Sequence, residues 1–185
     1  MDLVAWAAEE ARRRLAGVGT RWAHCDAVAS RAEDIAAIVN PEDRSLLVAA
    51  AYLHDVGYAP ELVVWGFHPL DGGRWLRALH LDRLAGLVAH HTGARFEARA
   101  LGLEPAMASF ADEESAVSDA LTYCDLTTGP AGERVGVSDR LDDIEQRYGS
   151  GSVVVEALDS ASQTLAVMVE RTEQRLLSPR AANKP

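Results

Sequence analysis

The sequence predicts an all-α protein, and three observations support this prediction. Hydrophobic residues recur at intervals of three and four along most of the 185 residues, as they do on the buried face of a helix. Residues that start and stop helices separate these segments at typical helix lengths. No segment shows the sustained alternation of a β-strand, and the one β-branched cluster, residues 153–155, is short.

In the first part of the chain, start and stop signals predict helices at residues 2–16, from 20 or 21 to 39, and 41–55. Asp2 is a suitable N-cap for the first of them. Asn40 and Pro41 form a strong start signal for the third, because proline is well tolerated at the first helical position. Gly57 then ends the third helix, since glycine commonly follows a helix C-terminus.

The rest of the chain continues the pattern after a loop at residues 58–67, which is rich in proline, glycine and aromatic residues. Residues 104–111 are predicted to form a second loop. Residues 1–178 are expected to be a single domain with a C-terminal helix, followed by a disordered tail at 179–185. The predicted helices of this part are residues 68–79, 82–91, 94–101, 112–126, 138–148 and 152–177.

The composition limits the kind of partner. The formal net charge is -10, and the sequence has no basic patch or arginine run suited to a phosphate backbone. No nucleic-acid polymer is therefore expected as a partner. An acidic protein can still bind a small phosphorylated substrate when a metal ion supplies local positive charge. No apolar run reaches about 18 residues, so no membrane partner is expected. These features are compatible with assembly into a homo-oligomer.

The cysteines and the N-terminal residues bear on the compartment. The sequence has two cysteines and no C-x-x-C pair, which favours a reducing environment over a disulfide scaffold. The first residues lack the basic start and continuous apolar run of a signal peptide. We therefore expect a cytoplasmic protein.

Residues of metal-binding type fall on the predicted hydrophobic faces of several helices. A buried aspartate without a partner costs several kcal/mol, so an inward carboxylate calls for a compensating group. One bound cation would compensate all of these residues at once. Imidazole and carboxylate donors together favour a divalent transition metal: Mn, Fe, Co, Ni or Zn. The inward residues are His24, His54, Asp55, His91 and Asp125.

The order of these residues resembles the H…HD…D signature of the HD-domain superfamily of metal-dependent phosphohydrolases. His24, the pair His54 and Asp55, and Asp125 supply its parts, within the contexts LHDVG and TYCDLTTGP. The resemblance covers residues 21–147 and implies an HD-domain helical bundle. It also implies that these four residues hold one metal ion and that Asp55 is a catalytic residue. The implied reaction is hydrolysis of a phosphoester of a small phosphorylated metabolite, most simply a nucleotide.

Two further stretches extend the resemblance. GFHPLDGG contains His68, and VAHHTGA contains His90 and His91. Some HD families bind a second metal through two such histidines, among them cyclic dinucleotide phosphodiesterases and diadenosine tetraphosphate hydrolases of the HDIG/YqeK-like subgroup. The resemblance implies that His68 and His91 do so here, with Asp55 between two ions. His90 competes with His91, because spacing cannot choose between adjacent histidines.

Residues that contact the substrate are assigned less directly. Tyr58 stands three residues after Asp55, where many family members carry a lysine that contacts phosphate, so Tyr58 is a candidate for substrate binding. Arg74, Arg77 and Arg95 are further candidates for phosphate contact. The missing lysine keeps an HD-type di-iron oxygenase open. A separate alternative is a degenerate, non-catalytic HD module that binds a ligand or regulates.

Overall fold

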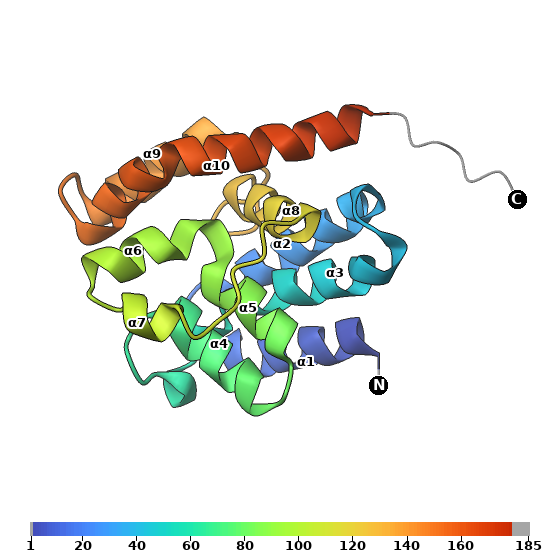
Figure 1. The fold of residues 1–185 in the computed structure, drawn as a ribbon, viewed down its shortest axis with the longest axis horizontal. Helices are drawn as coiled ribbons and strands as arrows, with labels where there is room; N and C mark the ends of the chain where they lie inside the picture. The colour runs from blue at the N-terminus through green and yellow to red at the C-terminus, as the bar shows by residue number, and fades with distance from the viewer. Residues whose placement is uncertain (1, 179–185) are drawn as a thin grey trace, which may run out of the picture.

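The computed structural model describes residues 2–178, and these residues form an all-α bundle, as predicted (Figure 1). The predicted tail at residues 179–185 lies outside the described residues. The α-helices are α1 (Leu3–Leu15), α2 (Arg21–Ile35), α3 (Arg44–Leu53), α4 (His68–Ala78), α5 (Asp82–His90), α6 (Ala94–Ala100), α7 (Glu104–Met107), α8 (Ala116–Leu126), α9 (Val137–Tyr148) and α10 (Val153–Leu177).

Two predicted boundaries are wrong in ways that matter for the interior. The third predicted helix begins as a 3₁₀ turn, Pro41–Asp43, and its α-helical part, α3, ends at Leu53 rather than at residue 55. His54 and Asp55 therefore follow α3, at the turn into the 3₁₀ segment η3 (Val56–Tyr58). Because the backbone turns here, two adjacent side chains can face the same point, which a continuous helix does not allow.

Two further corrections concern residues 104–126. The predicted loop at 104–111 contains the short helix α7, which has proline in its first turn. The helix predicted from residue 112 starts at Ala116 instead. Ser115 caps α8 by accepting hydrogen bonds from the backbone N–H groups of Val117 and Ser118, and Ser118 returns a capping-box hydrogen bond. The stronger start signal was therefore Ser115, not Asp112.

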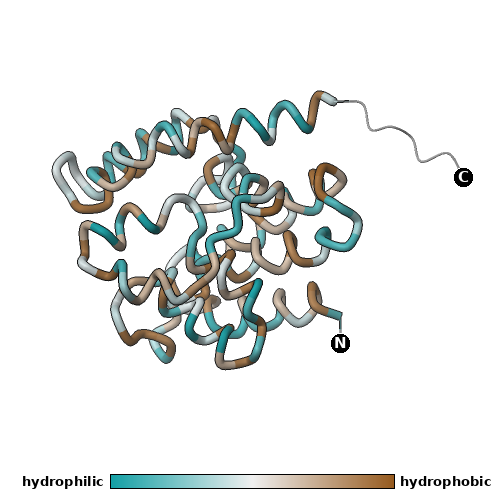
Figure 2. Tube along the Cα trace, in the orientation of Figure 1, coloured by the Kyte–Doolittle hydropathy of each residue, from teal (hydrophilic) through white to brown (hydrophobic). Residues whose placement is uncertain are grey.

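The main hydrophobic core lies between α1, α2, α3, α4, α5 and α8, and it is built mostly from fully buried alanine, leucine and valine. The two C-terminal helices form a separate layer. α10 packs on α8 and α6, and α9 contacts α8 and α10, so this layer crosses one side of the bundle (Figure 1). A second, smaller cluster of Leu126, Ala161 and Leu165 joins the layer to the bundle. Along α10 hydrophilic and hydrophobic residues alternate, as expected for a helix with one buried face (Figure 2).

Close packing between η3 and α4 depends on glycine. A Cβ atom added at Gly57 would collide with the backbone carbonyl of His68 and would lie 2.7 Å from the backbone nitrogen of Gly72. Gly72 faces η3 in turn, since its own added Cβ would lie 3.3 Å from the nitrogen of Gly57. The two backbones therefore approach to a distance that only glycine permits, and this approach sets the position of the first residue of α4.

The loop before α4 is held by one buried carboxylate. Asp71 is fully buried and accepts hydrogen bonds from the backbone N–H groups of Val64, Trp65 and Gly66, at 2.9, 3.0 and 3.1 Å. These bonds satisfy three donors that a loop would otherwise leave to water. The loop is thereby fixed against the start of α4, while the side chains of Val63, Val64 and Trp65 stay exposed.

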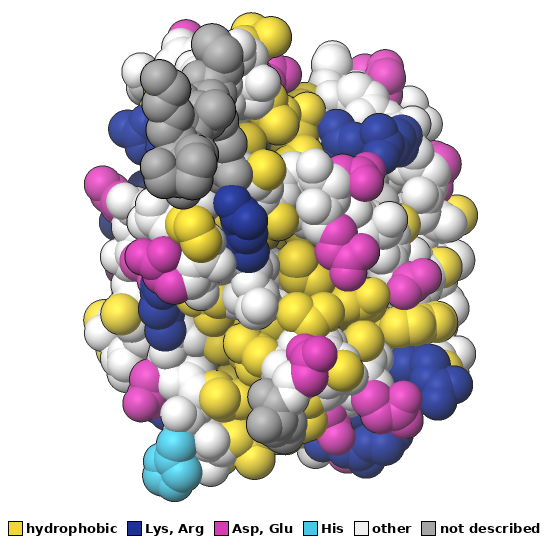
Figure 3. Space-filling view, turned by 90° about the vertical axis from the view of Figure 1, so that its right-hand side faces the viewer, with side chains coloured by type: hydrophobic (Ala, Val, Ile, Leu, Met, Phe, Trp, Pro, Cys, Tyr) yellow, Lys and Arg dark blue, Asp and Glu magenta, His cyan; other side chains and the backbone are white. Residues whose placement is uncertain are grey.

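The surface shows no segregation of charge on the face drawn in Figure 3. Hydrophobic side chains gather across the middle of this face, and acidic and basic side chains alternate around them. None of the helices within residues 2–178 combines the length and the apolar character that crossing a membrane requires.

Candidate metal centre

The predicted ligands come from separate elements and meet in the interior. His24 lies on α2, His54 and Asp55 follow α3, and Asp125 lies near the end of α8. His68 is the first residue of α4, and His91 follows α5. Five of the six residues are buried; the His68 side chain is 17% exposed.

Asp55 lies at the centre of the cluster. Its Oδ1 atom is 3.2 Å from Nε2 of His68 and 4.0 Å from Nε2 of His91. Its Oδ2 atom is 3.7 Å from Nε2 of His54 and accepts a hydrogen bond from Arg21 at 2.7 Å. The two carboxylate oxygens therefore face two different sets of histidines. Donor atoms lie within 4.8 Å of one another in each of two groups: His24, His54 and Asp55, and Asp55, His68 and His91.

Asp125 adds a second carboxylate beside the first group. Its Oδ1 atom lies 3.1 Å from Nε2 of His24 and 4.0 Å from Nε2 of His54. Its Oδ2 atom accepts a hydrogen bond of 2.6 Å from the hydroxyl of Thr92. Asp125 thus lies beside His24 and His54 and is held by Thr92, but it is outside both groups of donor atoms that lie within 4.8 Å of one another.

The hydrogen bonds of three histidines fix which nitrogen faces the centre. In each, Nδ1 lies close to a backbone carbonyl, which can only accept, so Nδ1 carries a proton, and in the neutral ring Nε2 turns a lone pair inward. Backbone partners of this kind commonly orient metal-binding histidines. The three distances are 3.0 Å for His24 to Gly129, 2.8 Å for His54 to Ala51 and 2.7 Å for His91 to Val88.

These lone pairs face carboxylate oxygens, and only a cation or a proton makes such an approach favourable. Nε2 of His54 shows the point most clearly, because it is buried and has no hydrogen-bond partner among the described residues. An unpaired buried acceptor costs free energy unless something coordinates it. The donor set of imidazole nitrogens and carboxylates therefore fits a divalent transition metal.

The protonation states agree with this fit. Burial would raise the pKa of Asp55, but His54, His68 and Arg21 outweigh burial and hold that pKa well below its usual range. The pKa of Asp125 is also lowered, because His24, His54 and Arg140 outweigh burial. Burial lowers the pKa of His54 to about 4 and also lowers the pKa of His68. Ionised carboxylates beside neutral imidazoles are the forms that bind a metal.

His24 differs from the other histidines. Burial would lower its pKa, but the hydrogen bond and charge of Asp125 outweigh burial and raise it. The Asp125 carboxylate therefore favours the protonated form of the His24 imidazole, in which Nε2 also carries a hydrogen and donates it to Asp125. Metal binding at this position would release that proton.

A cavity of about 270 Å³ opens above the cluster. Five of the six candidate ligands, all except His54, form its floor together with Arg21 and Tyr58. The C-terminal layer forms its roof, which we define as the residues of α9 and α10 that line it: Arg140, Ile144, Arg147, Tyr148, Val154, Ala157, Leu158 and Ala161.

Tyr58 lies where the sequence predicted a substrate contact. Its ring lines the cavity and stacks on His68, with ring centres 4.0 Å apart and planes inclined by 16°. The guanidinium of Arg21 lies 3.9 Å from the centre of the same ring. Tyr58 thus orients two residues that contact Asp55.

The three candidate arginines do not line the cavity. Arg74 donates to the carbonyl of Leu62 at 3.0 Å, Arg77 to the hydroxyl of Ser109 at 2.9 Å, and Arg95 to Asp112 at 2.9 Å. The arginines that line it are Arg21, Arg140 and Arg147, which sequence reasoning missed. Their spacing was a signal: Arg21 lies three residues before His24, and Arg140 and Arg147 lie seven residues apart, each pair on one helix face.

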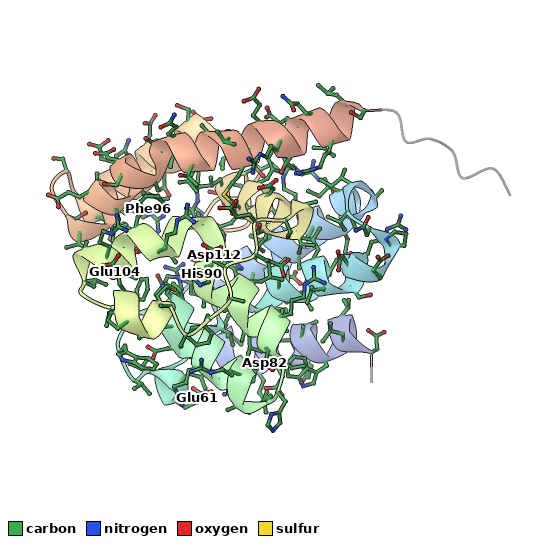
Figure 4. The ribbon with its side chains drawn as sticks, viewed as in Figure 1. Glu61, Asp82, His90, Phe96, Glu104 and Asp112 are labelled. Atoms are coloured by element: carbon green, nitrogen blue, oxygen red, sulfur yellow. The ribbon has the colours of Figure 1, made fainter. Side chains whose placement is uncertain are left out.

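His90 lies outside both groups of donor atoms. Its Nε2 donates to the carbonyl of Phe110 at 3.2 Å, and its Nδ1 lies 3.7 Å from a carboxylate oxygen of Asp112. Figure 4 shows His90 and Asp112 next to each other. The structure therefore brings His91, and not His90, together with Asp55 and His68.

His90 and His91 are adjacent in sequence but contact different groups, so substituting each of them gives a matched test of which one binds metal. We expect His91→Ala to lose about one of two bound ions per chain, because it removes one of three donors from the group around His68. His90→Ala should keep the metal content of the wild type. Elemental analysis of both purified variants checks this. Equal metal loss in both, or loss only in His90→Ala, would contradict the assignment.

The fold and this centre define an all-α protein with clustered histidines and aspartates of metal-binding type. Residues 21–122, more than half of the chain, match the HD domain family. The chain belongs to the HD domain family. The match does not extend to a subgroup, so the HDIG/YqeK-like assignment stays a prediction. Comparison with curated proteins and with solved structures gives no match.

Proposed function

We propose that this protein is a metal-dependent phosphohydrolase that acts on a small phosphorylated metabolite, and that the metabolite is a nucleotide. One observation supports this most strongly. Asp55 directs one carboxylate oxygen to His54 and the other to His68 and His91, at the floor of an open cavity. A carboxylate between two such sets of donors is suited to hold two ions close together, as in two-metal phosphoryl chemistry.

Each residue has a defined part in this proposal. When bound, the ions would bind phosphate oxygens and lower the pKa of the attacking water. Asp55 is the catalytic residue because it belongs to both sets, and Arg21 holds it through a hydrogen bond of 2.7 Å. The proposed ligands of the first ion are His24, His54, Asp55 and Asp125, and those of the second are Asp55, His68 and His91.

The walls of the cavity support a nucleotide as the substrate. Phe67 and Tyr148 offer aromatic rings, and Leu158 and the alanines of α10 offer an apolar surface. A base or sugar can pack against such walls while the phosphate reaches the floor. The apolar part of the roof, from Leu158 and the alanines of α10, thus complements the charged floor.

A di-iron oxygenase is the second candidate. Tyr58 stands in place of the lysine that contacts phosphate in many relatives, and the same six donors would serve two iron ions. A non-catalytic module is compatible with the donor set as well, so the experiment must separate three outcomes.

The test begins with the metal content of protein purified without oxygen. We expect about two ions of Mn, Fe, Co, Ni or Zn per chain, and phosphate release from a nucleotide panel that stops with a chelator and returns with added metal. Iron with oxygen-dependent turnover and no phosphate release would favour the oxygenase. Retained metal with no turnover of either kind would favour the non-catalytic module.

A further inference from the structure

Arg140 is a buried cation that the proposed metal chemistry does not use. Its side chain is only 8% exposed, yet within residues 2–178 it makes a single hydrogen bond, from Nη1 to Oδ2 of Asp143 at 3.1 Å. Nη2 lies 3.9 Å from Oδ1 of Asp125, and Nε is buried without a partner in the described part of the chain. A guanidinium with unused buried donors is costly unless a ligand pairs with it. Arg140 lines the cavity, and its Nη2 atom, which makes no hydrogen bond among the described residues, can meet a ligand there.

Arg147 lies two turns further along α9, also lines the cavity, and is 36% exposed. Its Nη2 atom is 2.8 Å from the same Oδ2 atom of Asp143 that Arg140 contacts. One carboxylate therefore serves two guanidinium groups, and Arg147 has no other carboxylate partner among the described residues. Arg21, the third arginine of the cavity, already pairs with Asp55.

We propose that Arg140 and Arg147 form an anion clamp, and that the substrate is a phosphoester with a second anionic group. This inference rests on the proposed function, because it assumes that a phosphoryl group lies on the metal-type residues. Arg140 binds that phosphoryl group, since it lies beside Asp125 at the floor. Arg147 binds the second group, phosphoryl or carboxyl, nearer the solvent.

Asp143 has a defined role in the clamp. It is 37% exposed and occupies the position between the two guanidinium groups, so it is an internal competitor for the anion. Charge-assisted hydrogen bonds from arginine to a carboxylate or a phosphate are of the same kind and strength. Neutralising Asp143 should therefore strengthen binding of a ligand with two anionic groups, an effect that a purely structural role of Arg147 does not predict.

The test uses two non-hydrolysable probes that differ by one carboxylate: methylphosphonate and phosphonoacetate. Their affinities for the metal-loaded full chain are measured by calorimetry. Arg140→Ala should weaken both probes by about tenfold, whereas Arg147→Ala should weaken phosphonoacetate about tenfold and leave methylphosphonate unchanged. Asp143→Asn should tighten phosphonoacetate several-fold. Arg134→Ala is the matched control, because this arginine is 70% exposed and pairs with Asp34 away from the cavity.

The calorimetry measures binding without turnover, so its result can be judged independently of the proposed hydrolase activity. If the protein hydrolyses nothing but shows the expected pattern of probe binding, the anion clamp is supported and the proposed hydrolase activity is wrong. If the protein hydrolyses phosphoesters but binds both probes equally, and Arg147→Ala has no selective effect, the proposed hydrolase activity is supported and the anion clamp is wrong. Weaker phosphonoacetate binding in Asp143→Asn would also overturn it. Metal content after each titration confirms that no probe has removed the ions.

Discussion

Asp55→Ala is expected to abolish metal binding while the helices remain. The substitution removes the residue common to both groups of donor atoms, so each of the two proposed ions would lose a ligand. We expect less than about a tenth of the wild-type metal content, since even residues that only orient ligands contribute 10- to 100-fold in affinity. Elemental analysis measures the loss, and circular dichroism checks that the helices are retained.

Two controls make this expectation specific. Asp55→Asn keeps the shape of the side chain and its bond from Arg21 but removes the charge, so it separates loss of ligand from loss of packing. Asp159→Ala removes an exposed carboxylate on α10 and should keep all of the metal. Full metal content in folded Asp55→Ala would show that the site assignment is wrong.

Gly57→Ala is expected to be strongly destabilising. The added methyl group would meet the backbone carbonyl of His68, and backbone atoms cannot move aside as the end of a side chain can. Forced separation of η3 and α4 should cost about 3 kcal/mol or more in the free energy of unfolding. For a chain of this size, this corresponds to a fall in Tm of about 10 °C. Since the collision involves His68 itself, the remaining folded protein should also bind less of the second ion.

Gly17→Ala is the matched control for this prediction. No atom lies within 4 Å of a Cβ atom added at Gly17, and its φ is not in the left-handed region. Its free energy of unfolding should therefore stay within about 0.5 kcal/mol of the wild type. Thermal unfolding of both variants, followed by circular dichroism, gives the comparison. A similar Tm for Gly57→Ala and Gly17→Ala would mean that η3 and α4 can separate without cost.

Most of the fold was accessible from sequence because helix signals are local. Periodicity and caps predicted the positions of the long helices, although α2 ends at Ile35 and not at residue 39. Another error arose where a nearby signal was stronger, as at Ser115. The end of α3 was misplaced by two residues because no local pattern distinguishes a helix end from a turn that packs against another element. That turn exists because Gly57 lets η3 approach α4, and this contact is long-range.

The candidate centre was predictable only in part. His24, His54, Asp55 and Asp125 stood out because each is a costly residue on an apolar face. His90 and His91 could not be separated, since their difference arises from the end of α5, where the chain turns. The arginines of the roof were missed because α9 is polar overall, and its position above the cavity follows from packing on α8 and α10.

The arrangement of floor and roof has a consequence for how this chain can diversify. The proposed ligands all come from residues 24–125, whereas the roof comes from residues 140–161, in a layer that lies beyond the matched HD domain. Substitutions in α9 or α10 that keep Arg140, which lies 3.9 Å from Asp125, are therefore expected to alter which molecule is accepted without disturbing the proposed ion-binding residues. A library of variants with substitutions confined to the roof would be an efficient way to redirect substrate specificity, because every variant keeps the same residues at the floor of the cavity.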